Sequence, residues 1–243
     1  MSNQVNEAAV WERLSQSRRV PLEPQWLEEV YSPSLSDELR RTLCEKLGMF
    51  AEQGWPPIEH LIKKHGSLPD LVMAAGLCHQ PDARDWLLEQ LNEHSESDAN
   101  TLCILQALSC WGAEVPEHVL NSCLHHPGQQ HRLAGLQLLG FRAHNLSDGE
   151  LLSLCSEVLH DFRDPVVIAT VRILQRRDGP IICETLSDLC RNGSDAASVA
   201  AFRALGCIGT TISRRYLLEL SQCLNDATRK QLACQQLQQQ FRS

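Results

Sequence analysis

Apolar positions along the chain recur at intervals of three and four residues, which is the period of an amphipathic α-helix. Leu217, Leu220 and Leu224 show this spacing clearly. No segment alternates apolar and polar residues over the length of a strand, as a half-buried strand would. The one run rich in β-branched residues, VVIATV at 166–171, also fits a buried helix face. The pattern predicts an all-α protein.

The predicted helices form a repeat. Six segments rich in small residues share an apolar signature with a period near 32: TLCEKLGMF (42–50), LVMAAGLCHQ (71–80), LCILQALSCWG (102–112), RLAGLQLLGF (132–141), VIATVRILQR (167–176) and SVAAFRALGCIG (198–209). Each is followed by a turn and a second amphipathic segment. A pair of such short helices cannot bury its apolar faces alone, whereas stacked pairs share one continuous core. We therefore expect an α-solenoid of about six two-helix repeats, in which small residues such as Gly76 and Gly140 let helices approach closely.

The ends of the chain differ from the repeats. Residues 5–31 predict short capping helices interrupted by Pro21 and Pro24, and residues 227–241 predict a polar, Gln-rich last helix. No linker is long enough to separate domains. The sequence predicts a single repeat domain over residues 1–243, with an N-terminal cap at 1–34, repeats at 35–225 and a C-terminal helix at 226–243.

Charge is distributed unevenly along the chain. The net charge is −8, from 22 Lys and Arg against 30 Asp and Glu, and the first 120 residues hold all of the excess acid. Nucleic-acid binding would need a broad basic face, so we expect no nucleic-acid partner. No stretch approaches 18 uninterrupted apolar residues and the N-terminus lacks an apolar signal core, so no membrane span is expected.

The chain contains 11 Cys, none of them in a CxxC pair. Most lie inside apolar helical runs such as IICETLSDLC (181–190), where a free Cys behaves as a small buried hydrophobe. We interpret these residues as reduced core thiols and expect a cytoplasmic protein.

Four stretches, CEKLGMF (44–50), AAGLCHQPDARDWLLEQL (74–91), GLQLLGF (135–141) and FRALGCIG (202–209), resemble the HEAT-like repeats of the phycobilisome lyase family. The resemblance covers about residues 40–225. Members of that cyanobacterial family attach, detach or chaperone bilin chromophores on light-harvesting proteins, and related HEAT-like proteins serve in iron–sulfur assembly. The Asp-x-x-Val-Arg-x-x-Ala stretch common in such repeats survives only as fragments at 79–86 and 163–172.

Motifs of catalysis are absent: the chain has no GxGxxG, P-loop, GxSxG or HExxH sequence. We therefore expect a non-catalytic scaffold or chaperone whose partner is a protein client or partner subunit. The resemblance implies a cyanobacterial phycobiliprotein or a bilin lyase as that partner. It also implies two alternatives, namely a phycobilin lyase subunit that handles a bilin transiently at a client cysteine, and an iron–sulfur assembly partner.

Two groups of residues are candidates for contact with a partner. Residues projecting from the second helices, which we expect to line a concave face, form the predicted binding surface: Glu89, His118, His125, Arg214, Arg215 and Glu219. Arginine pairs recur at Arg176-Arg177 and Arg214-Arg215, and guanidinium groups suit carboxylates such as bilin propionates.

The densest set of potential metal ligands lies in EHVLNSCLHHPGQQH (117–131). A zinc or iron–sulfur site would need about four converging nitrogen or sulfur ligands. Histidine near a helix end is also favoured by the helix dipole alone, without any metal. We expect no resident metal or cofactor, with zinc or an iron–sulfur cluster as the alternative on His118, Cys123, His125, His126 and His131.

Overall fold

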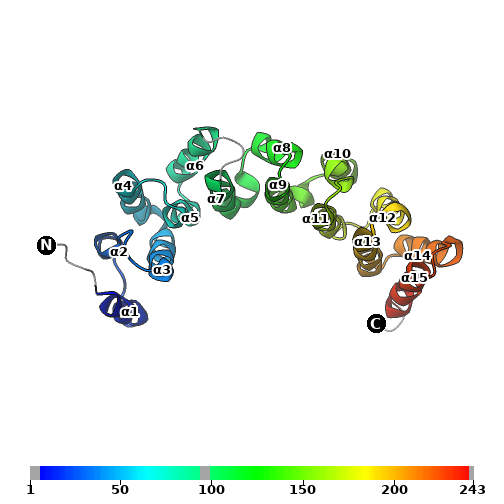
Figure 1. Ribbon diagram of the computed structural model, residues 1–243, viewed down its shortest axis with the longest axis horizontal. Helices are drawn as coiled ribbons and strands as arrows, with labels where there is room; N and C mark the ends of the chain where they lie inside the picture. The colour runs from blue at the N-terminus through cyan, green and yellow to red at the C-terminus, as the bar shows by residue number, and fades with distance from the viewer. Residues whose placement is uncertain (1–5, 94–98, 241–243) are drawn as a thin grey trace. The chain divides into compact units, whose positions relative to one another are not determined.

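The computed structural model describes residues 6–93 and 99–240, which form fifteen α-helices and three short 3-10 helices with no strand among them (Figure 1). The all-α prediction is confirmed, and the helices pack pairwise as in a HEAT-like solenoid. The β-branched run at 166–171 lies within a helix, as expected. The chain divides into two compact units, residues 1–115 and 116–243, and the organisation as a single domain remains a prediction.

Unit 1 contains the predicted cap and the first repeats. The two cap helices lie on either side of Pro21, and Pro24 begins the second of them. Its helices are α1 (Glu7–Ser15), α2 (Pro24–Val30), α3 (Asp37–Gly48), α4 (Trp55–His65), α5 (Pro69–Leu77), α6 (Pro81–Glu93) and α7 (Ala99–Leu108), with 3-10 turns at Ala51–Gln53 and Ser109–Glu114.

Unit 2 contains the later repeats and the predicted C-terminal helix. A capping box begins its third helix, where Ser147 and Glu150 satisfy each other's backbone N–H groups, as their spacing indicates. Its helices are α8 (Glu117–His125), α9 (Gln129–Arg142), α10 (Asp148–Leu159), α11 (Asp164–Leu174), α12 (Pro180–Asn192), α13 (Asp195–Ile208), α14 (Thr211–Cys223) and α15 (Ala227–Gln240), with a 3-10 turn at Ala143–Asn145.

The pairing of helices in unit 2 differs from the predicted order. Each helix rich in small residues packs more extensively on the helix before it than on the helix after it, giving the pairs α8–α9, α10–α11, α12–α13 and α14–α15. The signature segments are therefore the second helices of their repeats. Apolar periodicity identifies both helices of a pair. It is the same whether a helix pairs with the helix before it or with the helix after it, so the sequence pattern alone does not decide which two helices form a repeat.

This pairing produces two layers in unit 2. Helices α9, α11, α13 and α15 contact one another in sequence and form the odd-numbered layer, while α8, α10, α12 and α14 form the even-numbered layer. Within this unit the odd-numbered layer lies on the inner side of the curve (Figure 1). The helices that we expected to line a concave face are the even-numbered ones, so that expectation is wrong for unit 2.

Two glycines show how small residues are used. A Cβ built at Gly76 would lie 2.4 Å from the backbone oxygen of Ala107, so α5 and α7 can approach only because Gly76 has no side chain. Gly140 is different, because a Cβ there would meet nothing within 4 Å. The expected role of Gly140 in close helix contact is therefore wrong, and its open side becomes important below.

The eleven cysteines are all free thiols. Six are buried and two are partly buried, which confirms the expectation of core thiols for the middle of the chain. Burial raises the pKa of Cys123 and of Cys155 to about 12. The last three, Cys207, Cys223 and Cys234, are exposed, contrary to that expectation. Among the described residues, no helix combines the length and the apolar character that crossing a membrane requires.

Candidate functional site: a basic groove on unit 2

A groove runs between α9 and α11, two helices that pack side by side in the odd-numbered layer. It has a volume of about 330 Å³, and it is open to solvent along one side. On each helix the lining positions recur every three to four residues, so one face of each helix forms one wall. The lining residues are Leu133, Leu136, Gln137, Gly140 and Phe141 on the α9 side and Ala169, Arg172, Ile173 and Arg176 on the α11 side.

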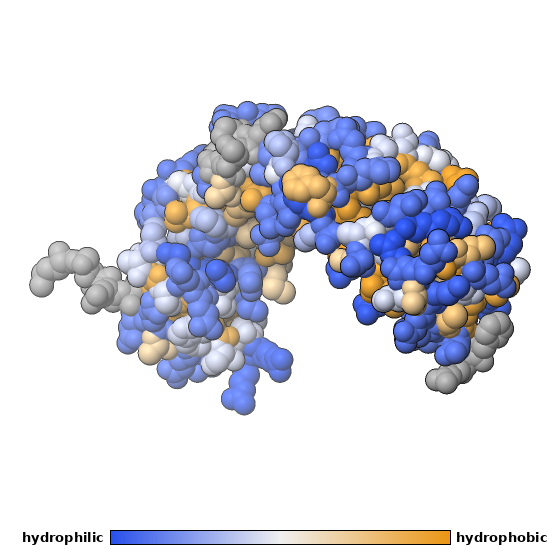
Figure 2. Space-filling view, turned by 45° about the vertical axis from the view of Figure 1, so that its right-hand side comes forward, coloured by the Kyte–Doolittle hydropathy of each residue, from blue (hydrophilic) through white to orange (hydrophobic). Residues whose placement is uncertain are grey.

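The floor of this groove is apolar and partly exposed. Leu136 and Ile173 are buried beneath it, whereas the Phe141 ring on its rim is 42% exposed. Gly140 lies beside Phe141 and leaves the α9 wall without a side chain at that point. Figure 2 shows a mainly hydrophilic surface interrupted by hydrophobic patches, and large exposed apolar side chains such as Phe141 are few. An apolar floor that remains accessible is a feature of binding surfaces.

Two arginines form the basic edge of the groove. Arg172 and Arg176 are four residues apart and both are exposed. In the described part of the chain, neither guanidinium forms an ion pair with a carboxylate. Like charges at this spacing repel each other, so the pair is slightly unfavourable in the absence of an anion.

Charge is segregated between the two layers of unit 2. The odd-numbered helices α9, α11, α13 and α15 contain six Arg or Lys against two Asp, and both Asp residues lie in the first turn of a helix. The even-numbered helices α8, α10, α12 and α14 contain three Arg against seven Asp or Glu. The groove therefore opens on the basic layer. Arg203 on α13, one repeat after Arg172, is also exposed and without an ion pair among the described residues.

The sequence pattern indicated only part of this site. Arg176 belongs to one of the two arginine pairs that we singled out, but its neighbour Arg177 has a structural role. The Arg177 side chain donates to Asp148 Oδ1 at 2.9 Å from Nε and to the backbone oxygen of Ala143 at 2.9 Å from Nη1. Arg172 and Phe141 were missed. The four-residue spacing of Arg172 and Arg176 would have indicated a shared face had it been considered together with the apolar positions.

The predicted surface residues lie on even-numbered helices of both units. Glu89 is exposed on α6 of unit 1, and His118 is exposed on α8. On α14, Arg215 Nε lies 3.8 Å from Glu219 Oε1, and Arg214 Nε donates to Gln240 Oε1 at 3.2 Å. These α14 side chains thus have partners, whereas Arg172 and Arg176 form no ion pair within residues 6–93 and 99–240.

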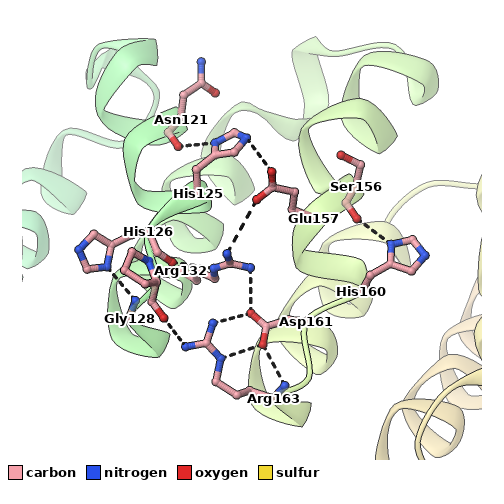
Figure 3. Close-up of polar contacts among 11 residues, drawn as sticks. Asn121, His125, His126, Gly128, Arg132, Ser156, Glu157, His160, Asp161 and Arg163 are labelled. Carbon is pink, nitrogen blue, oxygen red and sulfur yellow. Dashed lines mark hydrogen bonds and ion pairs between the residues drawn. The ribbon is translucent and has the colours of Figure 1, made fainter.

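His125 belongs to a chain of polar contacts that joins two repeats (Figure 3). Its Nδ1 donates to the backbone oxygen of Asn121 at 2.8 Å, and its Nε2 lies 3.7 Å from Glu157 Oε1 on α10. Glu157 also faces Arg132, whose Nη1 lies 3.0 Å from Asp161 Oδ2. The contacts continue from α8 through α9 to the turn after α10.

Asp161 is the centre of that turn. Its side chain is almost fully buried and accepts hydrogen bonds from Arg163 at 2.7 Å on each carboxylate oxygen, besides the contact with Arg132. The hydrogen bonds from Arg163 hold the pKa of Asp161 below its usual value, although burial acts in the opposite direction. Arg163 also donates to the backbone oxygen of Pro127 at 2.7 Å, which ties neighbouring repeats together.

A larger hollow of about 740 Å³ lies beside this turn, between α11 and α12. It contains three carboxylates, but each already has a partner: Asp161 with Arg163, Asp164 with Ser194, and Asp188 with Arg191. The charged groups of this hollow are thus engaged within the chain, whereas the two arginines of the basic groove are not paired with a carboxylate among the described residues. We therefore take the basic groove as the candidate functional site.

The potential metal ligands do not form a cluster. Cys123 is buried while His118 and His125 are exposed, and the rings of His126 and His131 stack with centroids 3.8 Å apart. No group of three or more His, Cys, Asp or Glu residues is placed to hold a metal ion in residues 6–93 and 99–240.

Comparisons with known proteins give little beyond the fold. No protein-family model matches the chain, and no curated protein matches it. Among solved structures, the chain is similar to human deoxyhypusine hydroxylase in complex with glycerol, with 13% sequence identity, a TM-score of 0.43, and coverage of 100% of this chain and 93% of that chain.

Proposed function

We propose that this protein is a non-catalytic scaffold that holds a partner protein against the odd-numbered layer of unit 2. The observation that carries the proposal is the groove between α9 and α11, where partly exposed apolar residues lie beside two arginines that have no carboxylate partner among the described residues. Protein interfaces commonly combine such a floor with a polar rim, and Arg and Phe are enriched there.

The resemblance to the phycobilisome lyase family suggests which partner to test first. We propose a phycobiliprotein subunit or a bilin lyase chain as that client. An experiment would measure binding of the purified full-length chain to an apo-phycocyanin subunit by biolayer interferometry. We expect Arg172→Glu/Arg176→Glu to weaken this binding at least about tenfold, because complementary charges across an interface fix its orientation.

The matched control is Arg214→Glu/Arg215→Glu, which changes the net charge equally but lies on α14 of the opposite layer. The control should bind the client like the wild type. An equal loss of client affinity in both double variants would contradict the groove as the binding site. Normal client binding by both double variants would also exclude the groove as that site. If the wild type fails to bind any phycobiliprotein subunit or bilin lyase tested, the client proposal is wrong.

A second function is favoured by the same two arginines. They are four residues apart, both line the groove, and guanidinium groups bind carboxylates well. A lyase subunit would use them to hold the propionates of a bilin while another subunit supplies the chemistry. Titration with phycocyanobilin, followed by absorbance, tests this alternative: it requires saturable binding that Arg172→Glu/Arg176→Glu abolishes.

A further inference from the structure

We infer that the groove between α9 and α11 accepts an amphipathic helix of the partner with carboxylates along one edge. This inference rests on the proposed function and specifies its chemistry. The apolar side of such a helix would lie on Leu133, Ala169 and the exposed Phe141 ring, above the buried Leu136 and Ile173. Its acidic edge would face Arg172 and Arg176.

The two walls of the groove differ in charge, so a partner helix should carry acidic residues along only one of its edges. The α11 side carries Arg172 and Arg176, whereas the α9 side presents Gln137, the open face of Gly140 and the Phe141 ring. A partner with acid along both edges would place carboxylates against the Phe141 ring, which offers no hydrogen bond to offset their desolvation. A partner without acid would leave the repulsion between the two arginines unrelieved.

The dimensions of the groove fit a helix better than an extended chain. Its lining positions on α9 run from Leu133 to Phe141, which is about 12 Å at the rise of an α-helix. Anchors at positions i, i+3 or i+4, and i+7 of a docked helix span a similar length. An extended peptide gains affinity mainly by adding to a sheet edge, and the described residues contain no strand.

The basic edge continues beyond the groove. Arg203 on α13 occupies the repeat position of Arg172, 31 residues later, and contacts between α11 and α13 place these helices side by side. No carboxylate lies in the bodies of α9, α11 or α13 after their first turns. A longer acidic helix could therefore meet Arg203 as well, whereas a basic segment would find no complementary charge on these helices.

Gly140 provides a test that does not alter charge. It lies within α9 and has open space on its side-chain face, so a larger residue there projects into the groove without disturbing the core. Gly140→Leu should block the occupant while leaving both arginines in place. Gly140→Ala is the conservative companion, with a smaller effect in the same direction.

The experiment uses a fluorescein-labelled peptide of about 15 residues, the length of a short stable helix, with Leu at i, i+3 and i+7 and Glu along one edge. Its control has the same composition in an order that destroys the apolar face. Fluorescence anisotropy with the full chain should show binding of the amphipathic peptide at least about tenfold tighter than of the control, since the apolar anchors supply much of the affinity.

The variants separate the contributions of charge and shape. Arg172→Glu/Arg176→Glu and Gly140→Leu should each weaken peptide binding about tenfold or more, while Arg214→Glu/Arg215→Glu should leave it unchanged. Circular dichroism melting of each variant confirms that it is folded. Equal binding of the scrambled control, or retention of binding in Gly140→Leu, would overturn the inference. Tighter binding of single-stranded RNA than of the peptide would do so as well.

The same variants distinguish this inference from the proposed function. If Arg172→Glu/Arg176→Glu no longer binds the phycobiliprotein client but the wild type does not bind the peptide, the groove is still the client-binding surface. The inference that its occupant is an acidic helix is then wrong. If the peptide binds as expected but the client binds all variants equally, the groove does bind acidic amphipathic helices. The proposed client then binds elsewhere on the chain.

Discussion

At the scale of single residues, the most consequential contacts are those between buried groups of opposite charge or polarity. In unit 1 the side chain of Asp70 is only 6% exposed. It accepts a hydrogen bond from the Tyr31 hydroxyl at 2.9 Å, and Arg40 Nε lies 3.3 Å from the same oxygen. Burial raises the pKa of Tyr31 far above its usual value, so its hydroxyl remains a donor at every relevant pH. Asp70 thus joins α2, α3 and α5.

Replacing Asp70 tests this junction. Asp70→Ala leaves the buried Nε of the partly buried Arg40 and the buried Tyr31 hydroxyl without their carboxylate, so we expect the free energy of unfolding to fall by about 3 kcal/mol. Asp37→Ala removes the other carboxylate beside Arg40, but that side chain is 80% exposed, so the expected loss stays under about 1 kcal/mol. Urea unfolding of both variants gives the comparison, and similar losses would show that burial does not govern these contacts.

Asp161 predicts a pH dependence in unit 2. Its pKa is lowered in the folded protein, so the stabilisation is present above the unfolded pKa and is lost as the pH falls through the folded value. Asp161→Asn should therefore be less stable than the wild type at pH 7 by about 2 kcal/mol, the range for hydrogen bonds to charged groups. The difference should shrink below about pH 4, where the unfolded carboxyl becomes protonated. A constant difference from pH 7 to pH 3 would contradict this assignment.

At the scale of helices, glycine has opposite roles at two positions of the same repeat signature. Gly140→Ala should raise the free energy of unfolding by up to about 1 kcal/mol, because Ala is the better helix former and nothing lies within 4 Å of its Cβ. Gly76→Ala should lower it, because its Cβ would overlap the backbone of Ala107. Thermal melting of the two variants shows whether each substitution raises or lowers stability. Destabilisation by Gly140→Ala would mean that the groove is closed.

The elements also show what a single sequence can and cannot predict. Periodicity at three and four residues located the helices, and Ser147 with Glu150 marked a helix start, because both signals are local. The phase of the pairs was not local, since α9 could pack on the helix before or after it. The same limit hid the site: Arg172 and Phe141 are far apart in sequence and share a groove only because α9 and α11 are neighbours in one layer.

At the scale of the whole molecule, the thiols report which parts of the chain are packed. The six buried Cys should react slowly with a thiol reagent in the folded protein, because burial both shields them and raises the pKa of residues such as Cys123 and Cys155. Cys207, Cys223 and Cys234 should react rapidly. Counting labels by mass spectrometry after a short exposure checks the expectation of three fast sites, and rapid labelling of most of the eleven would contradict the described core.

Division of the chain into two compact units leads to the last prediction. In a repeat protein each pair of helices contacts mainly its neighbours, so a set of several stacked pairs can retain its own core. Unit 2 has four such pairs, with fully buried residues including Phe202, and all lining residues of the groove lie within it. We therefore expect residues 116–243, expressed alone, to give a helical circular dichroism spectrum, to unfold cooperatively, and to bind the acidic amphipathic peptide with an affinity within about threefold of the full chain, the usual context dependence of such sites. Residues 1–115 should not bind that peptide.

A helical fragment 116–243 without peptide binding would place part of the binding surface in unit 1. An unfolded fragment would show that the second unit depends on the first for its stability.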